Sequence, residues 1–400
     1  MDFLNEAKAM EQELVENRRW LHSHAEVAFD LTGTKAYVRA KLEQMGYSPA
    51  DCGKAGLVVT VGGKQPGKVF LLRADMDALP IPEESGEEFA CGNGAMHACG
   101  HDLHTAILLG AAKLLKAHEE EIPGTVKLMF QPAEETMEGA KMMVAGGVLE
   151  NPHVDAAMGA HVFTAMPMPV GSVALMGSNM RMAGSDWFTI NIEGLGCHGA
   201  MPNTGVDPLN VMSHIHLALQ AINAREMDPM DNLVLTVGQM HGGQTSNVIP
   251  NEAMMSGTIR TLKNETRATV KARMEAIVST IATAFGAKAT VEWGAGCPVL
   301  IQNKELYKEV GGYLKGLEGM LFLDLDQLNM GGASSGMGSE DFSYVSNEVP
   351  SVFLGVPAGR PEDGYVHPQH HPKARFSEDA LPCGAAAYAQ VAMEWLKNNK

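Results

Sequence analysis

The sequence predicts an α/β protein with two domains, in which a mostly parallel sheet flanked by helices carries a smaller, inserted βαββαβ domain. Short apolar segments alternate with helical segments of about 12 residues between residues 57 and 159, as is typical of a parallel sheet covered by helices. From residue 186 the order becomes strand, helix, two strands, helix and strand, which is the ferredoxin-like split unit. The length of 400 residues also exceeds what one hydrophobic core usually holds.

The larger domain is expected to cover residues 1–180 and 293–400. Apolar residues recur at helical spacing near its start, and runs of branched apolar residues follow as strands. The sequence GGKQPGK between the first two runs is a turn signal that predicts a hairpin. Helices are predicted over residues 6–21, 34–45, 105–117, 140–148, 304–317 and 379–397, and strands over 57–61, 69–72, 125–131, 156–159 and 352–356.

The inserted domain is expected over residues 181–292. Its elements follow one another in βαββαβ order, after which the chain returns to the larger domain. Its strands are predicted over residues 186–194, 232–240, 252–260 and 287–293, and its helices over residues 208–225 and 265–285.

The composition argues against several classes of function. A net charge of −17 leaves no basic face for nucleic acid. No segment approaches the roughly 20 uninterrupted apolar residues of a membrane span, and the acidic, amphipathic N-terminus is unlike a signal peptide. The six cysteines are scattered along the chain, which predicts reduced thiols in a cytoplasmic protein.

The densest group of candidate metal ligands is the segment HACGHDLH, which begins at His97. A single glycine separates Cys99 from His101, so one tight turn can aim a thiolate and an imidazole at the same point. Asp102 is available to orient a ring nitrogen from behind the ligands. Taken alone, Cys-Gly-His would fit a buried free thiol beside incidental histidines equally well.

Other polar groups follow predicted strands. Glu134 and Glu135 come after TVKLMFQ, His161 follows AAMGA, and Asp75 lies in RADMD after VFLL. Ligands of parallel α/β sheets bind at the carboxyl ends of the strands, so these groups are expected at one edge. Adjacent carboxylates can divide the work, one binding metal and the other transferring protons. A proline-stiffened histidine segment, HPQHHP, adds further candidates near the C-terminus.

These residues belong to motifs that resemble the metal-dependent aminoacylase and carboxypeptidase family, in the branch of hippurate hydrolases and plant indoleacetyl-amino-acid hydrolases. The resemblance covers nearly the whole chain, and a run of ten segments in one order is highly specific. The segments are RRWLHSHAE, RADMDALPI, MHACGHDLHTAILLGAA, FQPAEE, GAHV, GCHGAMPNTGVDP, SNVIPNEA, GTIRT, GSEDFS and HHPKARFSEDALP.

The resemblance implies a site for two divalent metal ions. Thiolate, carboxylate and imidazole together suit zinc or manganese, with cobalt or nickel also compatible. The thiolate and the carboxylate bring two negative charges to two dications, which leaves positive charge for an anionic substrate. The implied ligands are Cys99, His101, Glu135, His161 and His370, the last being the first histidine of a His-x-Pro element.

The resemblance also implies roles outside the metal ligands. Glu134 matches the general base, and Asp75 matches an acidic residue behind the metals. In the inserted domain, which is a lid and dimerisation domain in the family, His198, Asn247 and Arg260 match residues that bind the carbonyl and carboxylate groups of the substrate. In relatives the lid histidine reaches the site of the partner subunit, so a homodimer is implied.

The expected reaction is hydrolysis of the amide bond of an N-acyl amino acid or short peptide. A dipeptidase or carboxypeptidase that accepts a free amino end is the enzymatic alternative. A metal-dependent peptide-binding module without turnover is the alternative from another class. Ala25 replaces a proline and Asn203 replaces a histidine that are common in the family, which bears on substrate fit more than on catalysis.

Overall fold

The computed structural model describes residues 1–328 and 336–400, and these form two compact units. Unit 1 comprises Met1–Met180, Asp341–Lys400 and the described part of Ile301–Ser335. Unit 2 comprises Arg181–Leu300 and Gly336–Glu340. Unit 2 is therefore inserted into the sequence of unit 1.

Unit 1 is built on a sheet whose strands are β1 (Ala50–Cys52), β2 (Gly56–Gly62), β3 (Val69–Asp75), β4 (Thr125–Gln131), β5 (Ala156–Phe163), β6 (Ser172–Leu175), β15 (Leu321–Asp324) and β16 (Ser351–Pro357). Their order is β1-β2-β4-β3-β5-β16-β6-β15. The central run from β4 through β3 and β5 to β16 is parallel. Every residue of β3 and β16 is buried, as expected for strands covered on both faces.

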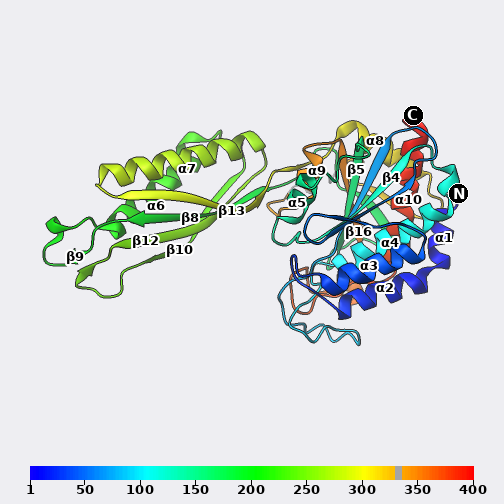
Figure 1. The fold of residues 1–400 in the computed structure, drawn as a ribbon, viewed down its shortest axis with the longest axis horizontal. Helices are drawn as coiled ribbons and strands as arrows, with labels where there is room; N and C mark the ends of the chain where they lie inside the picture. Colours follow the sequence, from blue (N-terminus) through cyan, green and yellow to red (C-terminus); the bar gives the residue numbers. More distant parts are fainter. Residues whose placement is uncertain (329–335) are drawn as a thin grey trace. The chain divides into compact units, whose positions relative to one another are not determined.

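Helices cover both faces of this sheet. They are α1 (Phe3–Ala9), α2 (Glu11–Ser23), α3 (Thr32–Gln44), α4 (His101–Ala117), α5 (Gly139–Ala145), α8 (Lys304–Lys315), α9 (Ser343–Ser346) and α10 (Ala380–Asn398). Helices α4 and α10 pack together against β3, while α1 and α2 lie outside them and bring the two termini close together (Figure 1). Helices α5 and α9 pack against each other beside β4 and β16. Within the described ranges, no helix is long and apolar enough to cross a membrane.

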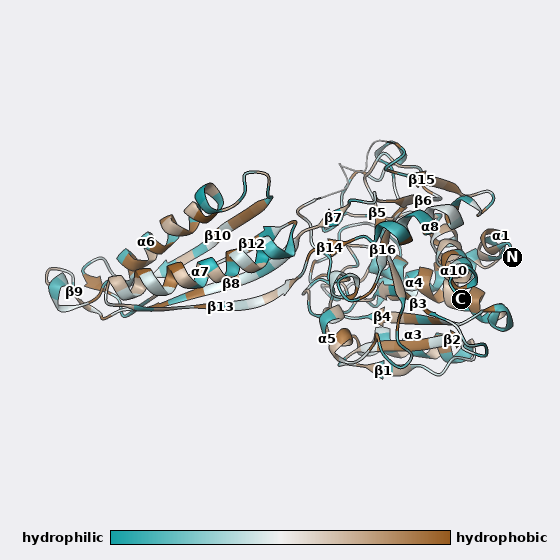
Figure 2. Ribbon diagram, turned by 90° about the horizontal axis from the view of Figure 1, so that it is seen from above, coloured by the Kyte–Doolittle hydropathy of each residue, from teal (hydrophilic) through white to brown (hydrophobic). Residues whose placement is uncertain are grey.

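Unit 2 confirms the predicted βαββαβ domain. Its main sheet contains β8 (Gly184–Glu193), β10 (Leu233–Gly242), β12 (Glu252–Thr261) and β13 (Lys288–Cys297), in the antiparallel order β10-β12-β8-β13. Helices α6 (Pro208–Ala221) and α7 (Asn264–Ala284) lie side by side on one face, where Phe188, Ile190 and Ile192 of β8 are buried (Figure 2). The other face carries the alternate residues, among them Trp187 and Arg260, and is not covered by these helices.

The predicted hairpin between residues 57–61 and 69–72 is wrong. Strand β4 lies between β2 and β3 in the sheet, antiparallel to the first and parallel to the second. The glycine-rich segment therefore connects β2 and β3 across the end of β4, and these two strands are not paired with each other. The predicted first helix is also two helices, α1 and α2, which are separated at Met10. The short strands β6 and β15 were not predicted.

Candidate metal centre

The five predicted metal ligands lie together in unit 1, at the carboxyl ends of β3, β4 and β5. The Sγ atom of Cys99 is 3.3 Å from Nε2 of His161 and 3.3 Å from Nε2 of His370. Oε1 of Glu135 is 3.6 Å from Nε2 of His370 and 3.9 Å from Nε2 of His101. Among the described residues, five groups of candidate ligand atoms lie within 4.8 Å of one another, and two of these groups consist only of predicted ligands, Cys99–His101–His161 and Cys99–Glu135–His370. Because Cys99 belongs to both, this ligand cluster has two adjacent sites that share one thiol.

The backbone that presents these ligands is unusual at three positions. Gly100, between Cys99 and His101, has φ +92°, and a Cβ atom there would lie 2.4 Å from a methyl carbon of Val162. Only glycine fits this turn, which starts α4. Ala133, just before the two glutamates, and His370 also have positive φ, 54° and 64°. Non-glycine residues in this region are uncommon and cluster at functional sites, where the surrounding structure holds them.

Backbone carbonyls fix how two of the imidazoles are protonated. Nδ1 of His101 lies 2.8 Å from the carbonyl oxygen of Asp77, and Nδ1 of His161 lies 2.6 Å from that of Val162. A carbonyl only accepts, so Nδ1 of each ring carries a proton and Nε2 faces the cluster. Burial opposes protonation of His101, but the charges of Asp75 and Cys99 raise its pKa well above the usual range, so Nε2 of His101 would give up a proton when a metal binds. Nε2 of His101 and Oε1 of Glu135 are buried without a hydrogen-bond partner among the described residues. Buried nitrogen and oxygen atoms without hydrogen-bond partners, grouped around a thiol, are suited to bind a metal cation.

The electrostatics of the ligand cluster also fit a cation. Burial raises the pKa of the Cys99 thiol well above its usual range and raises the pKa of Glu135 to about 7. Burial lowers the pKa values of His161 and His370, which keeps both rings neutral, as metal ligands must be. The protein alone therefore resists the ionised thiol and carboxylate, and two dications would supply the missing positive charge.

Asp75 lies behind the ligand cluster and bonds to His104, a histidine to which the sequence analysis assigned no role. Its Oδ1 accepts a hydrogen bond from Nδ1 of His104 at 2.5 Å, and Nε2 of His104 accepts the backbone N–H of Val162 at 2.8 Å. Both ring nitrogens of His104 are thus occupied, so His104 supports the strand that carries His161 and is not itself a ligand. The signal available in the sequence was its position three residues after His101.

The expectation for Asp102 needs correction. Its Oδ2 accepts hydrogen bonds from Nε of Arg18 and Nδ1 of His22, both at 2.8 Å, and neither residue is a candidate ligand. Burial would lower the pKa of His22, but the charge of Asp102 and hydrogen bonds to Asp102 and Glu83 raise it to about 9. Asp102 therefore joins α2 to the first turn of α4, while the carbonyl of Asp77 orients the ring of His101.

Glu134 lies at the edge of the ligand cluster and is 5% exposed. Its Oε2 is 4.0 Å from Nε2 of His101. The backbone N–H groups of Glu134 and Glu135 donate to the two carboxylate oxygens of Asp77, at 3.0 and 3.2 Å. Asp77 thus holds the turn on which the two glutamates diverge, a role the sequence reasoning did not assign to it.

Three predicted substrate-binding residues lie in unit 2. His198, in β9 (Cys197–His198), pairs with Val248 of β11 (Val248–Ile249). Nδ1 of His198 accepts the N–H of Ala200 at 3.0 Å, which leaves the proton on Nε2. The carbonyl of Asn247 accepts the N–H of Gly199 at 2.8 Å, so the structure brings these two predicted residues together. Both side chains are exposed.

Arg260 lies apart from them on β12. Its guanidinium carbon is 4.9 Å from the centre of the Trp187 ring. Burial lowers its pKa, and no carboxylate of the described residues forms an ion pair with it. A half-buried guanidinium without an anion is suited to bind a carboxylate.

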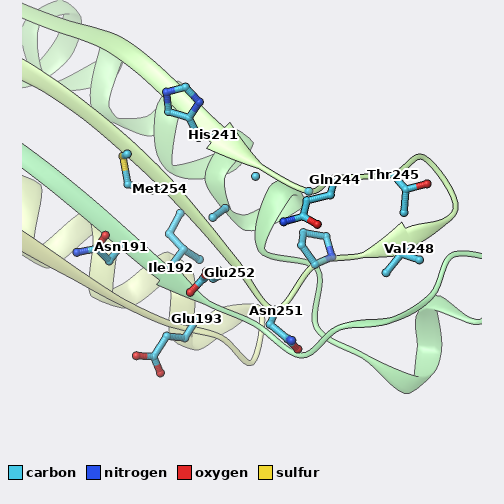
Figure 3. A pocket seen from close by; sticks show the side chains of 14 residues that line it. Asn191, Ile192, Glu193, His241, Gln244, Thr245, Val248, Asn251, Glu252 and Met254 are labelled. Atoms are coloured by element: carbon cyan, nitrogen blue, oxygen red, sulfur yellow. The ribbon is translucent and has the colours of Figure 1, made fainter.

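A separate hollow of about 740 Å³ lies at one end of the unit 2 sheet (Figure 3). Strands β8, β10 and β12 and the loop after β10 form it, and its walls include Asn191, Glu193, His241, Asn251 and Met254. None of the predicted site residues, all of which lie in the described part of the chain, lines it. The chemistry therefore points to the ligand cluster and not to this hollow.

The chain is similar to known proteins over most of its length. Residues 71–394 match the model of the peptidase family M20/M25/M40. The chain is 37% identical over 379 residues to an N-acetyl-L-cysteine deacetylase of Bacillus subtilis (strain 168). The aligned region covers 93% of this chain and 85% of that protein. It is 38% identical over 391 residues to IAA-amino acid hydrolase ILR1-like 4 of Arabidopsis thaliana, with coverage of 95% and 84%.

Two further similarities bear on the reaction and the metals. The chain is 34% identical over 399 residues to thermostable carboxypeptidase 2 of Saccharolobus solfataricus, with coverage of 98% of this chain and 97% of that protein. A dinuclear metal-binding peptidase of the M20 family from Bacillus subtilis has a similar solved structure, with a TM-score of 0.78, 31% identity and coverage of 98% and 99%. The likeness thus extends over both units.

Metal-free protein is expected to release protons when zinc binds, because Cys99 is protonated and Glu135, with a pKa of about 7, is partly protonated at neutral pH until a cation arrives. The affinity should rise with pH through the Glu135 pKa of about 7, since protons occupy the same atoms at lower pH. Isothermal titration calorimetry in two buffers of different ionisation enthalpy measures the protons released. Cys99→Ser should weaken both sites, because the thiol belongs to both triads.

Cys383→Ser is the matched control, since this buried thiol donates to the carbonyl of Gly171 and lies outside the cluster. It should bind zinc like the unaltered protein. An affinity that does not change with pH would contradict binding through the thiol and the carboxylate.

Proposed function

The chain belongs to the peptidase family M20/M25/M40, and on this premise we propose that it hydrolyses the amide bond of N-acyl amino acids with two metal ions. The observation that carries the proposal is the thiol-centred ligand cluster with Glu134 at its edge. Relatives named N-acetyl-L-cysteine deacetylase and IAA-amino acid hydrolase support this substrate class. The products would be a carboxylate and a free amino acid.

The ligand cluster would hold one ion through Cys99, His101 and His161, and the other through Cys99, Glu135 and His370. When bound, the ions would lower the pKa of a water molecule toward about 7 and polarise the scissile carbonyl. Neutral imidazoles, a thiolate and a carboxylate favour zinc or manganese, while cobalt and nickel remain compatible. The identity of the metal and the cytoplasmic location stay predictions.

Glu134 is the proposed general base. Its carboxylate would take a proton from the attacking water and deliver it to the amine as the C–N bond breaks. His198 would donate the proton on its Nε2 toward the oxyanion that develops on the carbonyl oxygen. Arg260 would pair with the carboxylate of the amino acid, and Asn247 would hold another polar group of the substrate.

The name of the carboxypeptidase relative keeps a peptidase as the second candidate. A panel of N-acetyl-methionine, hippurate and Ala-Leu, with released amine measured, separates the possibilities. The proposed function requires turnover of an N-acyl amino acid. Turnover of Ala-Leu alone would favour the peptidase, and binding without turnover of any compound would favour a peptide-binding module.

The adjacent glutamates should respond differently to amide substitution. Glu134→Gln is expected to keep both metal ions and to lose about 10²–10⁴-fold in turnover, because a base and not a ligand is removed. Glu135→Gln should lose metal instead. Metal analysis of the purified variants, together with the amine assay, checks both outcomes, and the opposite pattern would exchange the two roles.

Removal of the Arg260 guanidinium should affect charged substrates selectively. Arg260→Ala is expected to raise KM strongly for N-acetyl-methionine and little for N-acetyl-methioninamide, which lacks the carboxylate. Arg273→Ala is the control, because Arg273 is an exposed arginine of unit 2 that pairs with Glu226. Equal losses on both substrates would contradict carboxylate recognition by Arg260.

We further propose that the enzyme is a homodimer in which each His198 serves the site of the partner subunit. Glu134→Ala and His198→Ala should each be inactive alone. Mixed under conditions that allow subunit exchange, they should regain activity, since one site of each mixed dimer would have both residues. Proven exchange without recovered activity would refute the shared site.

A further inference from the structure

A fully buried carboxylate, that of Asp341, joins three segments that surround the ligand cluster. Its Oδ1 accepts hydrogen bonds from Nη2 of Arg73 at 3.1 Å and from Nε2 of Gln131 at 2.6 Å. Its Oδ2 accepts the backbone N–H of Ala140 at 2.9 Å. Arg73 lies on β3, Gln131 ends β4 and Ala140 lies at the start of α5. These bonds hold the Asp341 side chain in one orientation.

The backbone of Asp341 reaches the proposed general base. Its N–H lies near one carboxylate oxygen of Glu134, with an N···Oε1 distance of 3.4 Å. The other oxygen, Oε2, is the one that lies 4.0 Å from Nε2 of His101. The two oxygens of Glu134 are thus distinguished, since one meets a backbone donor and the other faces the ligand cluster.

The negative charge of Asp341 is balanced by the buried guanidinium of Arg73. Arg73 is fully buried, and its Nη1 also donates to Oδ2 of Asp75 at 2.8 Å. Its Nε donates to Oε1 of Gln131 at 2.8 Å. A buried guanidinium requires such partners, and loss of one carboxylate leaves the remaining charges and donors unsatisfied.

We propose that Asp341 is a positioning residue of the hydrolysis, which holds Glu134 so that Oε2 faces the water to be deprotonated. The inference rests on the proposed function, in which Glu134 transfers the proton. Asp341 is not one of the five predicted metal ligands, and in the proposed role it acts through Glu134. A general base works only within hydrogen-bond reach of the proton it takes, so a rotated Glu134 would be a poorer base without any loss of metal.

The test is Asp341→Asn, which keeps the size of the side chain and replaces one acceptor oxygen with an amide that cannot accept. We expect kcat for N-acetyl-methionine to fall about 10- to 100-fold, within the range of general-base effects, while KM and the metal content stay close to those of the unaltered enzyme. In a Glu134→Gln background the same substitution should cause no further loss, because both changes remove one function.

Lys127→Met is the matched control for a lost buried charge. Lys127 lies on β4 like Gln131, is 2% exposed and donates to the carbonyls of Val148, Glu150 and Pro152. It has no bond to Asp341 or Glu134 among these contacts. Its substitution should lower thermal stability and leave kcat per folded, metal-loaded chain unchanged.

Gln131→Met serves if Asp341→Asn does not fold, because it removes one donor to Asp341 and keeps the carboxylate. It should lower kcat by a smaller factor. Crystal structures of the unaltered and variant proteins give a readout that does not need turnover, and they should show the Glu134 carboxylate rotated or disordered in the variant. An unmoved Glu134, an unchanged kcat, an equal loss in the Glu134→Gln background or a loss of metal would each overturn the inference. An unaltered enzyme without turnover would refute the proposed function alone.

Discussion

The structure of unit 1 depends on one constraint, which is that the ionisable side chains of Cys99, His101, Glu135 and His161 are largely buried at the edge of a sheet where three parallel strands end. The buried Cys99 thiol and Glu135 carboxyl group resist ionisation, and the buried His161 ring resists protonation. The surrounding chain stabilises these groups through separate hydrogen bonds. Carbonyl oxygens bond to the rear nitrogens of His101 and His161, and the carboxylate of Asp77 receives the backbone N–H groups of both glutamates. The positive charge that would balance the ligands is left to metal ions.

Two buried arginines extend this arrangement away from the ligands. Arg73 donates hydrogen bonds to both Asp75 and Asp341. Its guanidinium group therefore supports both the strand with His161 and the turn with Glu134. Arg18 pairs with Asp102 and ties the N-terminal helix α2 to the turn that follows Cys99. Neither pair is a surface ion bridge, which would contribute little. Because these charges are buried, losing one partner is costly, and the geometry of the site becomes part of the stability of unit 1.

The sequence allowed the fold class and the members of the ligand cluster to be predicted, because their signals are local. Strand β4 begins and ends at the predicted residues, since its apolar run is bounded by Pro-Gly on one side and Pro on the other. The ligands belong to short motifs at strand ends. The hairpin was wrong because a turn signal does not reveal that a later strand inserts between its neighbours. The partners of Asp102 and the role of Asp341 could not be predicted, since they depend on residues that are distant in sequence.

The position of β16 has a consequence for how the chain is made. Strand β16 lies between β5 and β6, although both of these precede unit 2 in the chain and β16 follows it. During synthesis, β5 therefore has an unpaired edge until residue 357 has emerged, after all of residues 181–300. Unpaired strand edges invite wrong pairing, and contacts between distant residues form slowly. Unit 2 has a continuous sequence for its main sheet and can complete that sheet first. The predicted metal ligand His370 arrives later still, so the centre can assemble only after residue 370 has been synthesised.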